Sequence, residues 1–317
     1  MKVIDIIHNT KHPFFSFEII PPLRGGNIHK LYESIEPLIQ LAPPFINITF
    51  HRDEVEYRQA TDGSIRKITV TKRPGSVALA AAIMKRYPVE VVPHLVCGGA
   101  TAHQLENDLI DLNFLDIENV MALRGDAIPG ERYFTPEPGG YAHSRDLVRQ
   151  IKRLNQGIYL DDTLTNAVAT NFCIGVAGYP EKHHEAPNAT SDIEYLKQKI
   201  DAGADYIVTQ MFYDNRKYFT FVEKCRAQGI EVPIIPGLKP ISTSKHLDTL
   251  PRSFNIDIPE ELERAIRHCK SPMEIKQLGI EWCVQQSLEL LAQGAPAIHY
   301  YSMGKSDNIQ EIVKRVF

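Results

Sequence analysis

The stretch Asn119-Val120-Met121-Ala122-Leu123-Arg124-Gly125-Asp126 joins a mainly apolar run to a charged turn. An apolar run of this length, bounded by turn residues, is typical of a strand that is buried on both faces. The charged residues that follow it lie at the C-terminal end of that strand. In barrels of parallel strands covered by helices, residues at this end carry the chemistry.

The same unit of buried strand, polar residues and amphipathic helix recurs along the 317-residue chain. The strand candidates are 14–20, 45–50, 89–97, 119–123, 171–179, 206–212, 232–238 and 297–303. Most are nearly continuous in Val, Ile and Phe, which indicates parallel strands covered by helices. Two helices between them begin with predicted capping boxes, Thr101 with Gln104 and Ser191 with Glu194.

Eight such units predict an α/β fold, a (β/α)8 TIM barrel, in a single domain over residues 1–317. A doubly wound open sheet is the alternative, which is weakened because no G-x-G-x-x-G motif follows the first strand. The polar stretch 51–73 holds ten charged residues and predicts a long loop on the active-site face or an excursion at its rim. Residues 155–166 form a second insertion.

The composition is that of a soluble globular protein, with 43% hydrophobic and 23% charged residues. A net charge of −4 favours neither a nucleic-acid partner nor an anionic membrane. No apolar run approaches the roughly 20 residues that span a bilayer, and no basic-then-apolar leader begins the chain. The five cysteines are widely spaced without a C-x-x-C pair, so we expect reduced thiols in a cytoplasmic protein.

Polar side chains at the strand ends should converge on one mouth of the barrel. They are Glu18, Thr49, His51, His94, Arg124, Asp126, Tyr179, His183, Gln210 and Lys239. Glu18 is unusual because apolar residues flank it on both sides. A buried carboxyl is either protonated, which suits a general acid, or paired with an arginine such as Arg124, and the spacing leaves both open. Asp126 can face a ligand or cap a turn.

Metal binding and nucleophilic catalysis have little support. His183-His184-Glu185 and His51-Arg52-Asp53 offer ligand types without the spacing that places two ligands on one ion, so we expect no metal site. Cys97 ends the third strand, but no nucleophile signature accompanies it. A small buried apolar role is sufficient for this cysteine.

Eight short motifs, in order along the chain, carry a family resemblance. They are Ser16-Phe17-Glu18-Ile19-Ile20-Pro21-Pro22, Pro93-His94-Leu95, Ala122-Leu123-Arg124-Gly125-Asp126, Ala177-Gly178-Tyr179-Pro180-Glu181, Asp201-Ala202-Gly203-Ala204, Thr209-Gln210-Met211-Phe212, Ile235-Pro236-Gly237 and His299-Tyr300-Tyr301. Together they resemble the methylenetetrahydrofolate reductases over essentially the whole chain. The resemblance is to the bacterial type, the catalytic barrel without the regulatory domain of eukaryotic relatives.

The resemblance implies a barrel that binds FAD without a Rossmann domain. NADH or NADPH reduces the flavin and leaves. The folate then takes the hydride, so that 5,10-methylenetetrahydrofolate becomes 5-methyltetrahydrofolate for methionine synthesis. Glu18 matches the general acid that opens the folate ring, Asp126 a carboxylate beside flavin and folate, and Gln210 a folate contact. The positions matching the FAD site are Thr49, His94, Leu123, Arg124, Gly125, Asp126, Tyr141, Ala142, Tyr179, His183, Asp192 and Lys199.

Three features depart from the family pattern. Lys305 stands where members commonly carry an arginine, and it keeps the charge for folate binding but loses the bidentate fork. Leu250 falls at an aromatic folate-stacking position, and the stretch 51–73 is longer than in short bacterial relatives.

Two other functions remain as alternatives. One is a flavin-free pterin-binding barrel that transfers a one-carbon unit, and the other is a non-catalytic flavin or folate binder. The sequence leaves open the choice of NADH or NADPH and whether the chain forms a homo-oligomer.

Overall fold

The parallel strands form a closed barrel. A computed structural model describes residues 1–128, 131–302 and 306–317. The strands are hydrogen-bonded in the order β10 (Gly237–Leu238), β11 (Ala297–Tyr301), β1 (Phe14–Ile19), β2 (Phe45–Ile48), β5 (Glu90–Val96), β6 (Asn119–Leu123), β7 (Cys173–Gly178), β8 (Tyr206–Thr209) and β9 (Ile234–Ile235).

The segments β9 and β10 are two halves of one strand, separated by Pro236. Proline has no N–H for the ladder, but its carbonyl oxygen accepts a hydrogen bond from the His299 amide at 2.9 Å. Because β9 pairs with β8 and β10 pairs with β11, the ring closes with eight strands. The predicted (β/α)8 barrel is therefore confirmed.

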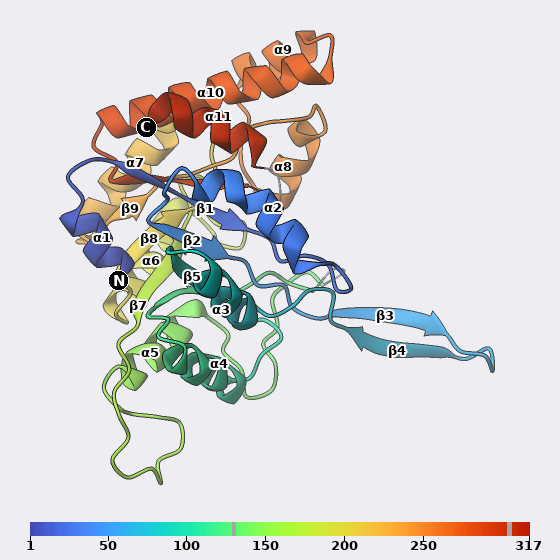
Figure 1. Cartoon of the computed structure of the whole chain (residues 1–317), viewed down its shortest axis with the longest axis vertical. Coiled ribbons are helices and arrows are strands. Elements are labelled where there is room, and N and C mark those ends of the chain that lie inside the picture. Colours follow the sequence, from blue (N-terminus) through green and yellow to red (C-terminus); the bar gives the residue numbers. More distant parts are fainter. Residues whose placement is uncertain (129–130, 303–305) are drawn as a thin grey trace.

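Helices surround the barrel (Figure 1). They are α1 (Val3–Asn9), α2 (Ile28–Ile39), α3 (Ser76–Arg86), α4 (Ala102–Phe114), α5 (Ser144–Leu154), α6 (Ala189–Asp201), α7 (Asn215–Ala227), α8 (His246–Phe254), α9 (Glu260–His268), α10 (Pro272–Ala292) and α11 (Asp307–Val316). No helix among the described residues is long and apolar enough to cross a membrane.

Helix α1 covers the N-terminal end of the barrel. Its Val3 and Ile6 join a buried cluster with inward-facing residues such as Phe14 and Phe45. The Asn119 side chain fixes the helix start, because its Oδ1 accepts a hydrogen bond from the Val3 amide at 2.8 Å. With this end filled, the opposite end of the barrel is left for ligands.

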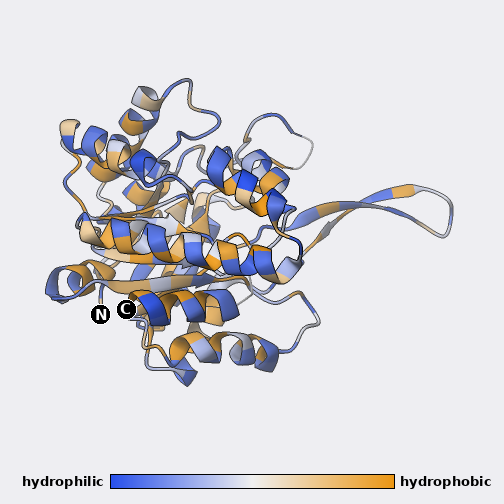
Figure 2. Ribbon diagram, turned by 90° about the horizontal axis from the view of Figure 1, so that it is seen from above, coloured by the Kyte–Doolittle hydropathy of each residue, from blue (hydrophilic) through white to orange (hydrophobic). Residues whose placement is uncertain are grey.

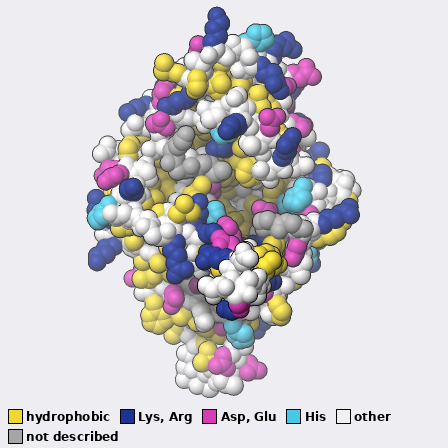
Figure 3. All heavy atoms as spheres, turned by 90° about the vertical axis from the view of Figure 1, so that its right-hand side faces the viewer, with side chains coloured by type: hydrophobic (Ala, Val, Ile, Leu, Met, Phe, Trp, Pro, Cys, Tyr) yellow, Lys and Arg dark blue, Asp and Glu magenta, His cyan; other side chains and the backbone are white. Residues whose placement is uncertain are grey.

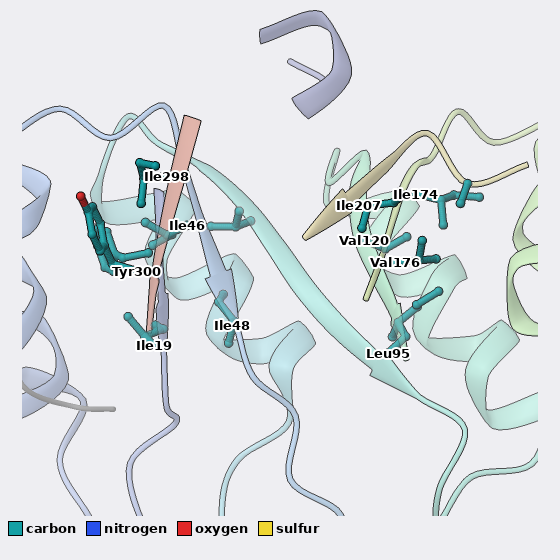
Figure 4. Close-up of a cluster of buried hydrophobic side chains, with 14 of the residues drawn as sticks. Ile19, Ile46, Ile48, Leu95, Val120, Ile174, Val176, Ile207, Ile298 and Tyr300 are labelled. Atoms are coloured by element: carbon teal, nitrogen blue, oxygen red, sulfur yellow. The ribbon is translucent and has the colours of Figure 1, made fainter. Parts of the chain in front are cut away.

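The strand side chains divide into two sets. Outward-facing Phe15, Phe17 and Ile19 of β1 pack in the larger core with helix residues such as Leu31. Figure 4 shows part of this layer, including Ile19, Ile46, Val120 and Ile298. The helices cover the outward face of the strands and exclude water from it. This accounts for the nearly continuous apolar runs in the sequence. The inward-facing residues toward the C-terminal end include the polar Ser16 and Glu18.

The polar stretch 51–73 forms a β-hairpin. Strand β3 (Glu54–Gln59) pairs antiparallel with β4 (Ile65–Val70), and Gly63 adopts a positive φ in the connecting turn. The hairpin projects far from the body of the molecule (Figures 1 and 2). The expected rim excursion is confirmed, although the sequence did not predict that it would be a paired hairpin.

The helix starts confirm one of the two predicted capping boxes and correct the other. The Thr101–Gln104 capping box is present at α4. The Ser191–Glu194 box is wrong, because the N-cap of α6 lies three residues earlier, at Asn188, whose side chain accepts a hydrogen bond from the Ser191 amide. Helices α1, α5 and α8 were not predicted from the sequence. The insertion 155–166 contains neither helix nor strand.

Candidate active site

A cleft of about 1940 Å³ opens at the C-terminal mouth of the barrel. Figure 3 looks toward this face, which is hollowed beside the hairpin. Nine of the ten predicted mouth residues line the cleft, namely Glu18, Thr49, His51, His94, Arg124, Asp126, Tyr179, His183 and Gln210. The cleft-facing side of the hairpin, with Val55, Tyr57, Lys67 and Thr69, extends one wall.

Glu18 is an uncharged acid at neutral pH. Strand β1 points its side chain into the mouth, where it is 7% exposed. Burial raises the pKa of Glu18 to about 8, although the positive charge of Lys239 acts in the opposite direction. Among the described ion pairs Arg124 binds Glu185, so the alternative pairing of Glu18 with Arg124 is wrong. A buried carboxylic acid with this pKa can donate a proton near neutral pH.

A neutral polar layer lies deeper in the barrel. The Asn47 amide nitrogen and His94 Nε2 are 3.2 Å apart, and the Ser16 hydroxyl and His299 Nδ1 are 2.8 Å apart. Burial lowers the pKa of both imidazoles to about 3, so both are uncharged at neutral pH. The floor of the cleft therefore offers hydrogen bonds without net charge.

The turn after β6 presents an arginine beside a glycine. The Arg124 guanidinium pairs with Glu185 and lies 4.9 Å from the centre of the Phe134 ring. Its Nη2 atom is buried and has no hydrogen-bond partner among the residues that the structure describes. Gly125 has φ +88°, and a Cβ there would lie 2.6 Å from Val96 Cγ1, so the position requires glycine.

A second polar group follows β7. The Lys199 ammonium donates to the Ala177 carbonyl oxygen at 2.6 Å and lies 6.0 Å from the centre of the Tyr179 ring. Burial lowers the pKa of Lys199 to about 8, against the opposing effect of Asp192. The Asp192 carboxylate accepts from the His183 amide at 3.0 Å. Lys199 and the Arg124 Nη2 atom, which has no hydrogen-bond partner in the described part of the chain, suit a ligand that carries phosphate groups.

Asp126 and Gln210 complete the lining on either side of Tyr179. Asp126 is exposed and follows Gly125 directly. Gln210 follows β8. Its backbone N–H donates a hydrogen bond to the Gly178 carbonyl oxygen at 2.8 Å, which fixes the backbone at this position. Across the described part of the chain, no group of three or more His, Cys, Asp or Glu residues is placed to hold a metal ion.

Two of the expected cofactor positions lie beside the cleft instead of in its lining. Tyr141 packs against the main core and Ala142 is exposed, whereas His143 and Arg145 line the cleft. Lys305 lies outside the described residues. The sequence did not identify Arg52, Arg145 or Gln198 as cleft residues, because their side chains reach the mouth from loops and helices and not from strand ends.

Comparison with known sequences assigns the family. A sequence model of methylenetetrahydrofolate reductase matches residues 2–316. The chain belongs to the methylenetetrahydrofolate reductase family. A 5,10-methylenetetrahydrofolate reductase of Pectobacterium carotovorum is 30% identical over 295 residues, which cover 92% of this chain and 86% of the relative.

Plant members of the methylenetetrahydrofolate reductase family are longer. An Arabidopsis thaliana relative, methylenetetrahydrofolate reductase (NADH) 1, is 33% identical over 316 residues, which cover 96% of this chain and 48% of that protein. The chain thus spans about half the length of this relative. Among solved structures, an uncharacterized Clostridium thermocellum protein that binds two copies of 5-methyl-5,6,7,8-tetrahydrofolic acid matches with a TM-score of 0.59 at 16% identity, covering 98% of this chain and 96% of that one. That likeness shows the fold alone.

Leu250, where the family resemblance places an aromatic folate-stacking position, does not line the cleft. Leu250 is buried in a cluster with Met211 and Ile241, between α8 and the barrel. Phe254, one helical turn later, lines the cleft. Because helix α8 was not predicted, no helical periodicity indicated which of these two residues faces the cleft.

Proposed function

We propose that this protein reduces 5,10-methylenetetrahydrofolate to 5-methyltetrahydrofolate with NADH or NADPH, through a bound FAD. The observation that carries the proposal is Glu18, a protonated carboxyl in the mouth of a barrel of the methylenetetrahydrofolate reductase family. Relatives that bear the names of these reductases, one of them named for NADH, support the proposal. The barrel is proposed to act as a single catalytic domain.

The residues of the cleft fit FAD. The Arg124 Nη2 atom, without a partner among the described residues, and the Lys199 ammonium suit the pyrophosphate. Gly125 allows close approach of the backbone. Asp192 suits a ribose hydroxyl, while Tyr179 offers a ring to pack against the flavin. Other proposed contacts are Thr49, His94, Leu123, Asp126 and His183, with Tyr141 and Ala142 at the edge. A bound flavin would supply hydride transfer from the nicotinamide to the folate.

Glu18 is proposed to donate its proton to the folate nitrogen that leaves the methylene carbon as the five-membered ring opens. The product of that step is an iminium cation, which is the hydride acceptor. The Asp126 carboxylate stabilises this cation, and Gln210 holds the folate by its side-chain amide. The neutral floor around His94 and His299 adds no competing charge.

The five cysteines are free thiols, which supports placing the protein in a reducing compartment such as the cytoplasm.

An anaerobic reaction in two steps tests the proposal. The visible spectrum of the purified protein is recorded, NADH or NADPH is added until the flavin bleaches, and methylenetetrahydrofolate follows. We expect bleaching and then return of the colour. Bleaching without recovery would remove the folate as acceptor. A colourless protein that stays inert after FAD is added would favour the flavin-free pterin-binding barrel.

A further inference from the structure

Lys239 is the predicted mouth residue that lies outside the cleft lining. It directly follows β10 and is buried, with 7% exposure. In the sheet register Leu238 pairs with Tyr300, which places Lys239 beside Tyr301, and Glu18 pairs with Tyr301 from the other side. Residues in register on neighbouring parallel strands point to the same face of the sheet. Glu18 and Lys239 therefore flank Tyr301 on the inner face of the barrel, at its mouth.

Within the described part of the chain, the groups that adjoin Glu18 other than Lys239 are uncharged at neutral pH. From β2, the residue in register is Asn47. From β11, the pKa of Tyr301 is raised well above its usual value by burial, and that of His299 is lowered to about 3. From β5, the pKa of His94 is likewise lowered to about 3. Among the described residues, the charge that acts on the Glu18 carboxyl is that of Lys239.

We propose that Lys239 is a positioning residue, which provides the counter-charge for the Glu18 carboxylate that forms when the acid gives up its proton. The proposal rests on the acid role of Glu18 in the proposed function. In that step the O–H bond of Glu18 breaks, an N–H bond forms on the folate, and the electron pair stays on the carboxylate. In the proposed step Lys239 neither gives up nor takes up a proton.

The physical reason is the cost of a buried anion. A carboxylate at this buried position without a nearby cation would be strongly disfavoured, so Glu18 would hold its proton too tightly to act as an acid. A cation at fixed distance stabilises the anion as it forms, without the reorganisation that water requires. The lysine thereby adjusts the acid toward the working pH.

Lys239→Met tests the proposal, since methionine removes the charge at similar length. The first measurement is an infrared titration of the Glu18 carboxyl in the purified flavoprotein without folate, assigned by difference from Glu18→Gln. We expect its midpoint to rise by about one pH unit or more, a tenfold change in the equilibrium. Lys239→Arg should restore the midpoint. An unchanged midpoint in folded Lys239→Met would overturn the proposal.

The second measurement is the folate half-reaction. In Lys239→Met the folate half-reaction should slow by about 10-fold at pH 7. The alkaline limb of its pH–rate profile should move to higher pH. The rate of flavin bleaching by NADH or NADPH should stay the same. A loss of rate with an unmoved limb would indicate a merely structural role and overturn the proposal. Lys224→Met, an exposed change on α7, is the matched control and should alter neither measurement. If Lys239→Met does not fold, Lys239→Gln replaces it.

The two measurements separate the two proposals. The carboxyl titration needs no folate, so it reports on Lys239 even if the wild-type protein fails to reduce the folate. A wild-type protein with no folate half-reaction would contradict the proposed function and leave the titration result standing.

Discussion

The hydroxyl of Tyr301 donates a hydrogen bond at 2.6 Å to the backbone oxygen of Thr209, and it reaches that oxygen across Gly237. The Gly237 amide in turn donates to the Thr209 hydroxyl at 2.9 Å. Strands β8 and β11 are thereby tied together inside the barrel, over the strand that lies between them. The tie exists because position 237 has no side chain.

Gly237→Ala should destabilise the protein by about 2–3 kcal/mol, because overpacking against rigid atoms forces the backbone to shift. An added Cβ would lie 2.2 Å from the Thr209 oxygen and 2.6 Å from the Tyr301 ring. Urea unfolding followed by circular dichroism measures the change. Gly75→Ala is the matched control, since no atom lies within 4 Å of its Cβ, and it should cost less than about 1 kcal/mol. Equal effects at the two positions would refute the prediction.

The barrel was predictable because its signal is local and repeated. Each strand is buried on both faces, so each gives its own apolar run, and eight runs alternating with helices admit few folds. The strand from Asn119 to Leu123 was predicted with the bounds that the structure has. Even so, the split of the seventh strand at Pro236 was not predicted. It depends on how this strand pairs with the strands on its two sides, and a single run of sequence does not show that pairing.

The pairings within the site needed the closed barrel. Glu18 and Lys239 are 221 positions apart, and only the register through β11 places them on either side of Tyr301. The partner of Arg124 is Glu185, from the loop after β7, and no spacing rule selects it over Glu18. Phe254 lines the cleft from α8, a helix that was not predicted from the sequence.

Arg124→Lys should weaken FAD binding by about 10-fold or more while the fold is kept, because an ammonium cannot replace the planar fork. One guanidinium nitrogen pairs with Glu185, and the group packs over the Phe134 ring. The Nη2 atom has no hydrogen-bond partner among the described residues and can bind a ligand. Equilibrium titration of the apoprotein with FAD measures the affinity. Arg149→Lys, on the exposed side of α5, should leave it unchanged. Retention of full affinity in Arg124→Lys would limit this arginine to pairing with Glu185.

Asp126→Asn should raise the reduction potential of the bound flavin and slow the folate half-reaction by about 10-fold, the effect of about 1.4 kcal/mol. Loss of a negative charge beside the site favours the extra electrons on the flavin and disfavours a cationic folate. Spectral titration against a redox dye gives the potential, and stopped flow gives the rate. Asp53→Asn removes another carboxylate that lines the cleft, so it is the control for a general loss of charge. Unchanged values for Asp126→Asn would remove it from this role.

Glu18 should also make the stability of the protein depend on pH. Its pKa is about 8 in the folded chain, and its ordinary value is 4.5. Between these values the folded state holds a proton that the unfolded state has lost, so folding is disfavoured progressively as pH rises from about 4.5 to 8. Below that window the contribution is fully present, and above it the loss is complete. An acid poised for proton transfer is in this way a cost to stability.

The free energy of unfolding of Glu18→Gln minus that of wild type isolates this term. We expect the difference to grow in favour of the variant between pH 5 and pH 8, because glutamine has no proton to lose. Other groups, such as Glu181, whose pKa burial raises to about 7, cancel in the subtraction. Urea unfolding at a series of pH values provides the measurement, with Glu194→Gln on the exposed part of α6 as the control whose difference stays flat. A flat difference for Glu18→Gln would mean that Glu18 is ionised at neutral pH, and the acid role would then fail on thermodynamic grounds alone.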